Sequence, residues 1–266
     1  MTLIAVTIAG SDSGGGAGIQ ADLKTFSALG IYGASVITAL TAQNTMGVSA
    51  IHDVPSDFVT AQMDSIFSDL SIDAVKIGML SRTDIISAVA AGLDKWTPRW
   101  VVLDPVMVAT SGDRLIRDDA ISAIVSSLFP RVTLVTPNLA EAAALLGEPA
   151  ADNDRTIQKQ GEALLSMGAR AVLMKGGHGS GSESIDFLVT PSGTERFRAQ
   201  RISTPNTHGT GCTLSSAIAA ELAKGCSLRD AVETAKIYVT QALSASSTLM
   251  IGHGSGPVHH FHAFWK

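Results

Sequence analysis

Short, strongly apolar runs alternate with helical patterns along this chain, and no other feature constrains its fold as much. Six runs are typical of buried strands: residues 3–10 (LIAVTIAG), 34–40 (ASVITAL), 74–79 (AVKIGM), 100–106 (WVVLDPV), 132–138 (VTLVTPN) and 171–177 (AVLMKGG). Strands that are apolar on both faces and separated by helices indicate a parallel sheet covered on both sides. We therefore expect an α/β fold with a mostly parallel central sheet and right-handed crossovers.

Other segments complete this outline. One helix is expected from about residue 18 to 29. Another is expected to begin after a cap at Ser227 and to end at about residue 245. Residues 47–53 and 185–200 have hairpin patterns, and we expect them to extend the sheet or to form part of a lid. No linker composition interrupts the 266 residues, which favours a single domain spanning 1–266.

Charge and cysteine content narrow the function classes. The formal net charge of -5 opposes a nucleic-acid or anionic-membrane partner, which would usually require a basic face. No apolar run approaches the roughly 18 residues that a membrane span needs. The two cysteines, Cys212 and Cys226, suggest neither a disulfide framework nor a zinc site. We expect a cytoplasmic protein that acts on small molecules.

Four of the predicted strands end in polar or glycine-rich tips. These tips are GSDSGGG (10–16), DPVM (104–107), TPN (136–138) and KGGH (175–178). Open α/β sheets collect their ligand groups at the carboxyl edge of the strands. The sequence therefore predicts that the functional site lies at this edge.

The segment NTHGTGCTLSSAIAAEL, residues 206–222, combines a glycine-spaced turn, a cysteine and a helical pattern. The first N–H groups of a helix have no partner within it and the helix dipole favours negative charge, so such a turn predicts an anion site. Cys212 would lie at this positive end, where a thiol is expected to have a lowered pKa and to act as base or nucleophile. The alternative is a helix with a Gly and Thr start that buries a cysteine.

The glycine-rich segment GSDSGGGAG, residues 10–18, follows the first strand. It lacks the lysine of a P-loop. Residues 16–21 match a GxGxxA dinucleotide pattern, but no acid follows about 20 residues later to bind a ribose, so NAD binding is only weakly indicated. Asp12 and Asp22 flank the segment, which favours a binding loop for a small polar ring over a flexible turn.

Three charged residues follow other predicted strands. Asp104 and Glu141 suit a metal-nucleotide site, because Mg²⁺ usually takes one or two carboxylates together with phosphates and water. Lys175 could neutralise charge on a transferring phosphate. Each residue could instead have a purely structural role. The carboxylates could be helix caps or solvated charges, Glu141 could complement a helix dipole, and Lys175 could be a lysine that only follows a strand.

The C-terminal segment GHGSGPVHHFHAFWK contains four of the seven histidines, namely His253, His259, His260 and His262. A metal-binding tract is one interpretation. Adjacent histidines alternate faces, however, and no clear ligand spacing is present, so surface or packing roles are favoured.

Seven motifs occur in an order that resembles the hydroxymethylpyrimidine/phosphomethylpyrimidine kinases of thiamine biosynthesis. They are GSDSGGGAGIQADLKT, TALTAQNT, KIGML, LDPVM, TPNLAEA, KGGH and HGTGCTLSSAIA, and the match extends to GSGPVHHF near the end. The resemblance implies a ribokinase-like three-layer α/β/α sandwich and a homodimer. It also implies ATP-dependent phosphorylation of 4-amino-5-hydroxymethyl-2-methylpyrimidine and then of its monophosphate, with ATP and Mg²⁺ as cofactors.

The same resemblance assigns roles to matching positions. The residues implied to bind the pyrimidine are Gly10, Asp22, Gln43, Met79 and Val106. Asp22 would pair with the ring nitrogen and amino group, and Gln43 would supply a complementary amide. For phosphoryl transfer, the resemblance implies an anion hole formed by Gly209, Thr210, Gly211 and Cys212, with Cys212 also acting as base. It places Asp104 and Glu141 near Mg²⁺ and Lys175 near the ATP phosphates.

Alternatives remain open at this point. Cys212 stands where most ribokinase-like sugar kinases have an aspartate, which argues against a sugar substrate. A pyridoxal or pyridoxine kinase of the same fold is the nearest alternative. A non-catalytic pyrimidine-binding protein is an alternative of another class, and a dehydrogenase is a distant one.

Overall fold

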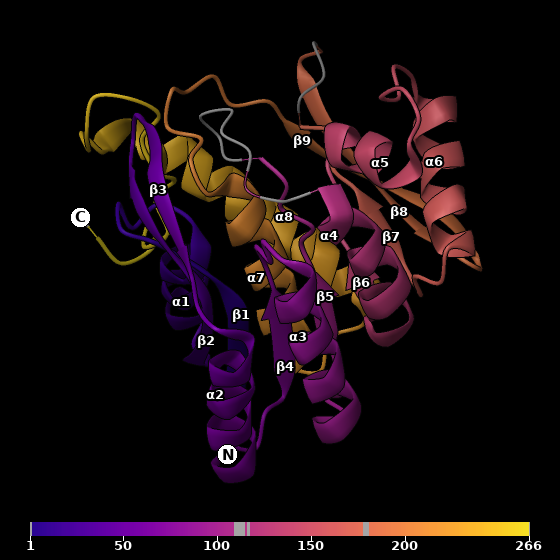
Figure 1. Ribbon diagram of the computed structural model, residues 1–266. Coiled ribbons are helices and arrows are strands. Elements are labelled where there is room, and N and C mark those ends of the chain that lie inside the picture. The colour runs from indigo at the N-terminus through magenta and orange to yellow at the C-terminus, as the bar shows by residue number, and fades with distance from the viewer. Residues whose placement is uncertain (1, 109–114, 116–117, 178–180, 266) are drawn as a thin grey trace.

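One nine-stranded sheet forms the centre of the molecule (Figure 1). The computed structural model describes residues 2–108, 115, 118–177 and 181–265. The strand order is β3-β2-β1-β4-β5-β6-β7-β8-β9. The strands are β1 Ile4–Asp12, β2 Tyr32–Asn44, β3 Gly47–Asp53, β4 Ala74–Ile77, β5 Val101–Leu103, β6 Leu134–Val135, β7 Val172–Met174, β8 Glu183–Thr190 and β9 Gly193–Gln200.

The central strands, from β2 to β7, pair in parallel with their neighbours in the sheet. Each of the six predicted strand segments overlaps one of these strands, and β1 and β2 extend beyond the predicted segments; the overlap confirms the expected parallel core. At the two edges β3 pairs antiparallel with β2, and β8 and β9 form an antiparallel hairpin beside β7. The two hairpin patterns in the sequence are therefore extensions of the sheet.

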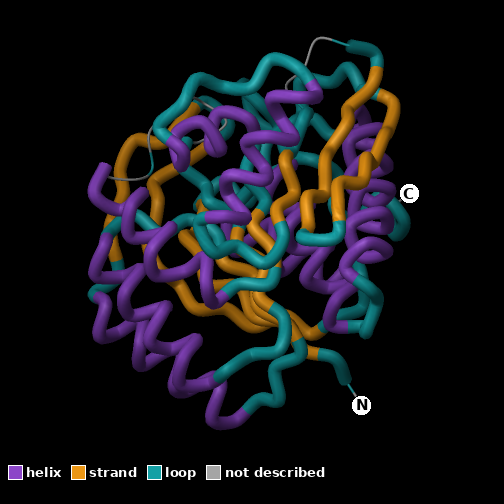
Figure 2. The backbone as a smooth tube through the Cα atoms, turned by 90° about the vertical axis from the view of Figure 1, so that its right-hand side faces the viewer, coloured by secondary structure: helices purple, strands orange, loops and turns teal. Residues whose placement is uncertain are grey.

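Helices cover both faces of the sheet, and the tube in Figure 2 shows the strands enclosed between them. One layer contains α2, α3, α4, α5 and α6, and the other contains α1, α7 and α8. The helices are α1 Gly18–Ala28, α2 Ser56–Asp69, α3 Thr83–Trp96, α4 Asp118–Ala123, α5 Leu139–Leu146, α6 Asp154–Ser166, α7 Thr210–Ala223 and α8 Leu228–Ala245. The result is a three-layer α/β/α sandwich, as expected.

The burial of α7 explains why the strands are apolar on both faces. Val6 and Ile8 of β1 pack into the core on the side of α2 and α3, whereas Ala5 packs on the side of α1 and α7. Every residue of α7 from Thr213 to Ala223 is buried, and its small side chains allow the helix to lie close to the sheet. Because helices exclude water from both faces, neither face of a central strand needs polar side chains.

The boundaries of the helices follow local signals. Helix α1 ends before Gly30, whose φ of 78° lies in the left-handed region that glycine adopts without strain. Helix α8 starts after Ser227, whose side chain accepts a hydrogen bond from the Asp230 backbone N–H. Both agree with the prediction from sequence. No helix in the described ranges is long and apolar enough to cross a membrane.

Two of the C-terminal histidines have packing roles. His259 and His260 are buried, and His260 Nε2 lies 3.1 Å from Thr213 Oγ1 at the start of α7. The His260 carbonyl accepts a 2.7 Å hydrogen bond from the Tyr238 hydroxyl. Burial lowers the pKa of His260 to about 3, so the ring is neutral near pH 7. The packing interpretation of these histidines is therefore confirmed.

Candidate active site

The carboxyl ends of the parallel strands bring several of the predicted residues to one edge of the sheet. Asp12 ends β1, Gln43 lies near the end of β2, and Met79 follows β4. Asp104 comes directly after β5, and Lys175 directly after β7. The chain places its polar strand tips where open α/β sheets bind ligands. His178 of the KGGH motif lies outside the described residues.

Lys175, Asp104 and Glu141 form one charged cluster. Lys175 Nζ lies 2.7 Å from Asp104 Oδ1 and 3.7 Å from Glu141 Oε2. Asp104 also accepts hydrogen bonds from Thr136 Oγ1 at 3.2 Å and from Ser215 Oγ at 3.2 Å. The tertiary structure therefore brings together two acids and a lysine that lie far apart in the sequence.

The pKa values of the two carboxylates in this cluster shift in opposite directions. Burial would raise the pKa of Asp104, but the nearby Lys175 and Lys76 ammonium groups outweigh burial and lower it. For Glu141, burial together with repulsion by Asp104 raises the pKa to about 7 against the opposing charge of Lys175. For Lys175, the carboxylates of Asp104 and Glu141 outweigh burial and raise the pKa. Asp104 and Lys175 are therefore the permanently charged members.

Glu141 also caps a helix. Its Oε2 accepts a 2.7 Å hydrogen bond from the Asn138 backbone N–H, while Asn138 Oδ1 accepts one of 2.8 Å from the Glu141 N–H. This capping box starts α5 and fixes the side chain at the sheet edge. The dipole-partner role considered for Glu141 is confirmed, and it leaves the carboxylate next to Lys175.

The turn that precedes α7 lies directly against this cluster. Gly209 is the N-cap residue with φ 80°, and α7 begins at Thr210. A Cβ atom added at Gly211 would lie 3.3 Å from Lys175 Nζ and 3.6 Å from Asp104 Oδ2. The absence of a side chain at Gly211 thus leaves the ammonium group of Lys175 beside the helix N-terminus, which is a favourable arrangement for an anion.

Cys212 lies near two helix N-termini, because a hydrogen bond from the Gly18 backbone N–H at the start of α1 reaches its thiol. The expectation of a lowered thiol pKa is nevertheless wrong. Burial raises the pKa of Cys212 to about 11, and the nearby carboxylates of Asp22 and Asp104 add to this. The charge of Lys76 and the Gly18 hydrogen bond act in the opposite direction but do not compensate.

Asp22 does not lie open to a ligand ring, which contradicts the direct pairing implied by the resemblance. Asp22 and Lys76 are both 0% exposed, and Lys76 Nζ lies 2.9 Å from each Asp22 oxygen. Thr7 Oγ1 and Ser216 Oγ each donate a 2.6 Å hydrogen bond to the same carboxylate. Four contacts within the protein therefore occupy the two oxygens, and Asp22 is a buried counter-ion in this structure.

Gly10, Met79 and Val106 lie near one another. A Cβ atom added at Gly10 would lie 3.2 Å from Met79 Sδ, so the glycine permits a close approach. Met79 belongs to a small apolar cluster against which Val106 and Val48 pack. Val48 is the β3 partner of Gln43 in the sheet register. The amide and the apolar side chains expected to contact a ring are therefore neighbours at the same edge.

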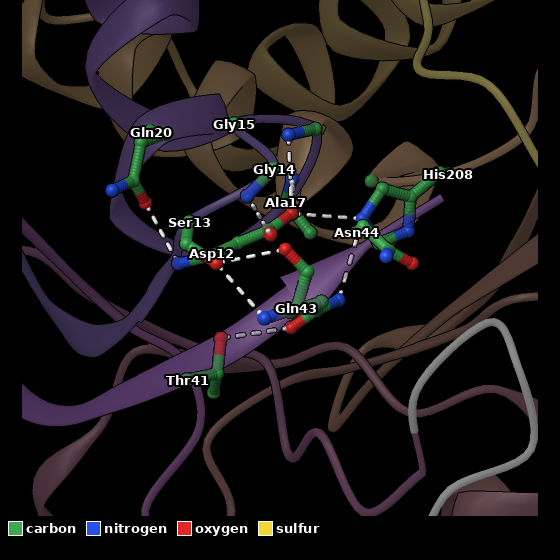
Figure 3. Close-up of polar contacts among 12 residues, drawn as sticks. Asp12, Ser13, Gly14, Gly15, Ala17, Gln20, Thr41, Gln43, Asn44 and His208 are labelled. Carbon is green, nitrogen blue, oxygen red and sulfur yellow. Dashed lines mark hydrogen bonds and ion pairs between the residues drawn. The ribbon is translucent and has the colours of Figure 1, made fainter. Parts of the chain in front are cut away.

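Two features of this region were not predicted from the sequence. The first is Lys76, a lysine within an otherwise apolar strand whose only sequence signal is its position in AVKIGM. The second is the contact between Asp12 and His208, where His208 Nε2 lies 2.8 Å from Asp12 Oδ2 (Figure 3). These residues are 196 positions apart, so no local pattern indicates the pair.

Comparison with known proteins identifies relatives of this chain. A model of the phosphomethylpyrimidine kinase family matches residues 12–259. The hydroxymethylpyrimidine/phosphomethylpyrimidine kinase of Rhizobium meliloti strain 1021 is 59% identical over 266 residues, which is 100% of both chains.

Solved structures agree with the fold. The phosphomethylpyrimidine kinase of Clostridium difficile 630 is 43% identical with a TM-score of 0.81, covering 91% of this chain and 100% of that one. A Bacillus subtilis pyridoxal kinase, solved as an ADP complex, is 34% identical with a TM-score of 0.91, covering 99% of each chain. The fold is ribokinase-like, as expected.

The buried pair of Lys76 and Asp22 generates a stability prediction. Replacing Lys76→Met leaves the Asp22 charge buried without its counter-ion, and we expect a loss of about 3–5 kcal/mol in the free energy of unfolding. The double variant Lys76→Met, Asp22→Asn removes both charges and should be less destabilised than the single variant. Urea unfolding at pH 7 measures both.

Lys95→Met is the matched control for this experiment, because Lys95 forms an exposed ion pair with Asp64. That change should cost no more than about 1 kcal/mol. A double variant that is less stable than Lys76→Met alone would contradict the assignment of Lys76 as the counter-ion of Asp22.

Proposed function

The chain belongs to the phosphomethylpyrimidine kinase family, and we propose that it uses ATP to phosphorylate 4-amino-5-hydroxymethyl-2-methylpyrimidine and then phosphorylates the monophosphate to the diphosphate. These are the two steps that supply the pyrimidine of thiamine. The observation that carries this proposal is the position of Lys175, 3.3 Å from a Cβ placed at Gly211 in the turn that starts α7. A cation and a helix N-terminus here face the same space.

Phosphoryl transfer depends mostly on positioning and on stabilisation of charge. In the proposed reaction the hydroxymethyl oxygen forms a bond to the γ-phosphorus while the bond from that phosphorus to ADP breaks. The backbone N–H groups of the Gly209–Cys212 turn would hold the negative charge that develops on the transferring group, although that of Thr210 also donates to the Thr207 carbonyl at 3.3 Å. Lys175 would neutralise charge on the ATP phosphates.

The donor set of Asp104 and Glu141 fits Mg²⁺, because this ion commonly takes one or two carboxylates and completes its shell with phosphates and water. No group of three or more His, Cys, Asp or Glu residues that could hold a metal alone occurs in the described part of the chain. A site of two acids beside a phosphate cradle is consistent with that. When bound, Mg²⁺ would offset the charge of the ATP phosphates.

We propose that Gln43 pairs with the pyrimidine and that Met79 and Val106 pack against its ring, with Gly10 giving room for close approach. The apolar cluster around Met79 and its proximity to Gly10 support this. Asp22 would act indirectly, by holding Lys76 behind the site. In the second step the same ring would be bound with its new phosphate directed toward the Gly209–Cys212 turn.

The proposed function is tested by offering hydroxymethylpyrimidine, its monophosphate and pyridoxal in parallel with MgATP and measuring ADP release. We expect turnover of both pyrimidines, with kcat/KM well above that for pyridoxal. Pyridoxal belongs in the assay because a pyridoxal kinase shares the fold. A large preference for pyridoxal would overturn the substrate assignment, and no ATP consumption with any of the three would overturn the enzyme assignment.

Cys212 is proposed to accept the proton of the substrate hydroxyl, and this has a pH consequence. With a thiol pKa of about 11, the thiolate fraction rises about tenfold for each pH unit between 7 and 9. We expect kcat/KM to rise with pH over this range. Cys212→Ala should lower kcat by about 10²- to 10³-fold and should abolish the rise.

The control for this experiment is Cys226→Ala, since Cys226 is also a free thiol but contacts Glu221 instead of the charged cluster. It should leave kcat and the pH profile unchanged. Near wild-type turnover by folded Cys212→Ala protein would show that Cys212 is not the base.

We also propose a homodimer that uses the β2–β3 edge. Strand β3 is the last strand at this edge of the sheet, and Leu40, Met46 and Ile51 on the β2–β3 hairpin are exposed. An open strand edge with exposed apolar side chains favours a protein partner, and a second copy is the partner that the family resemblance implies.

Light scattering tests this proposal. The expected mass is twice the 27.5 kDa of one chain, and Ile51→Lys should reduce the mass toward that of a monomer. Ile237→Lys is the control, because Ile237 is an exposed isoleucine on α8 at a different face. A monomeric wild-type protein would refute the homodimer, and an Ile51→Lys variant that keeps the dimer mass would refute this edge as its interface.

We propose that residues 1–266 form one kinase domain that works in the cytoplasm with no nucleic-acid or membrane partner. The nine strands in the described part of the chain belong to one sheet, and both cysteines are free thiols. The net charge of -5 supports a small-molecule role.

A further inference from the structure

Asp12 organises the glycine turn that follows β1. Its side chain accepts hydrogen bonds from the backbone N–H groups of Gly14 at 2.8 Å, Gly16 at 3.1 Å and Ala17 at 2.8 Å (Figure 3). Burial would raise the pKa of Asp12, but its hydrogen bonds to His208 and to this turn outweigh burial and lower it. Asp12 is therefore an ionised acceptor at neutral pH.

His208 joins this turn to the one that starts α7. The ring donates to Asp12 across 2.8 Å, and the next residue in the chain is Gly209. The two turns also lie against each other: a Cβ at Gly209 would lie 1.9 Å from the Gly16 carbonyl oxygen, and a Cβ at Gly16 would lie 2.4 Å from Cδ2 of the His208 side chain. No side chain fits between them, so a shift of one turn displaces the other.

The same contact determines what Gln43 can do. Because ionised Asp12 can only accept, His208 Nε2 must carry the proton of that hydrogen bond. Gln43 Nε2 lies 3.5 Å from this ring nitrogen, which then has no lone pair to offer it. The Gln43 backbone is meanwhile held by Ser13, whose Oγ donates to Gln43 O at 2.7 Å and accepts from Gln43 N at 2.8 Å.

We propose that Asp12 and His208 form a positioning pair. The pair holds the Gly209–Cys212 turn in a fixed position relative to the glycine turn that follows β1. It also keeps the Gln43 amino group available to an acceptor on the substrate ring. The inference rests on the proposed function for the identity of the substrate. Neither residue is assigned a chemical step. Both act through groups that contact the ring or the transferring phosphate.

Steady-state kinetics of variants tests the pair. His208→Ala should raise KM for hydroxymethylpyrimidine, because the Gln43 amino group is no longer kept available to the ring. It should also lower kcat, because the turn that starts α7 is no longer held in place. Together these changes should lower kcat/KM about 100-fold. KM for ATP should change much less, because in the described part of the chain Lys175, Asp104 and Glu141 form their hydrogen bonds and ion pairs with residues other than Asp12 and His208. His208→Gln retains an N–H donor for Asp12 and should recover at least about tenfold of the loss.

A double-mutant comparison separates a pair from two independent residues. Asp12→Asn should lose activity in the same two parameters, and Asp12→Asn, His208→Ala should lose little more than the worse single variant, because residues that act together are not additive. His253→Ala, at an exposed histidine on the C-terminal segment, should retain wild-type kinetics.

Thermal unfolding of every variant distinguishes positioning from a purely structural role. The proposal is overturned if His208→Gln is as impaired as His208→Ala at equal melting temperature, if the two single losses add fully, or if KM for the pyrimidine is unchanged. A wild-type protein that prefers pyridoxal would refute the proposed substrate alone. The same variants, assayed with pyridoxal, would then still decide whether Asp12 and His208 act as a pair.

Discussion

The structure depends on one buried ion pair. Asp22 and Lys76 are completely removed from water, and each charge can be tolerated there only because the other lies 2.9 Å away. Together with Thr7 and Ser216, the pair connects β1, β4, α1 and α7 at a single point in the interior. The starts of α1 and α7 therefore cannot move independently. This matters because the thiol of Cys212 receives a hydrogen bond from Gly18 at the first of these helix starts and lies within the second.

Charges alternate from this interior pair outward to the sheet edge. Lys76 influences Cys212 and Asp104, Asp104 contacts Lys175, and Lys175 lies beside both Glu141 and Gly211. Burial is the main cause of the raised pKa of the Cys212 thiol, and the carboxylates of Asp22 and Asp104 add to it by opposing the positive charge of Lys76. A phosphate that reaches this turn must share the Lys175 ammonium group with two carboxylates. The proposed Mg²⁺ would relieve that competition by occupying the acids.

Specificity in this family arises from the site and not from the fold, since the same sandwich serves a pyridoxal kinase. In this chain the first glycine turn, the amide of Gln43 and the Gly209–Cys212 turn are linked through Asp12 and His208. In the proposed function, ring recognition and charge stabilisation would therefore be mechanically connected. Because Asp22 is buried, the proposed direct recognition of the ring rests on Gln43 and the apolar residues near Met79, and Asp22 has a structural role as counter-ion.

The alternation of apolar runs and helical patterns was sufficient to predict the parallel sheet, its two helical layers and the edge at which polar residues collect, because periodicity and strand-end chemistry are local properties of a chain. The motif order was likewise sufficient to indicate the family. Only the tertiary structure decided the partners of Asp22, the hydrogen bond between Asp12 and His208 across 196 residues, and the high pKa of Cys212. A pKa depends on burial and on charges that arrive from distant parts of the chain, and a helix N-terminus seen in sequence shows neither. Cys212 was correctly placed at the start of α7, but its protonation was determined by neighbours that only folding brings to it.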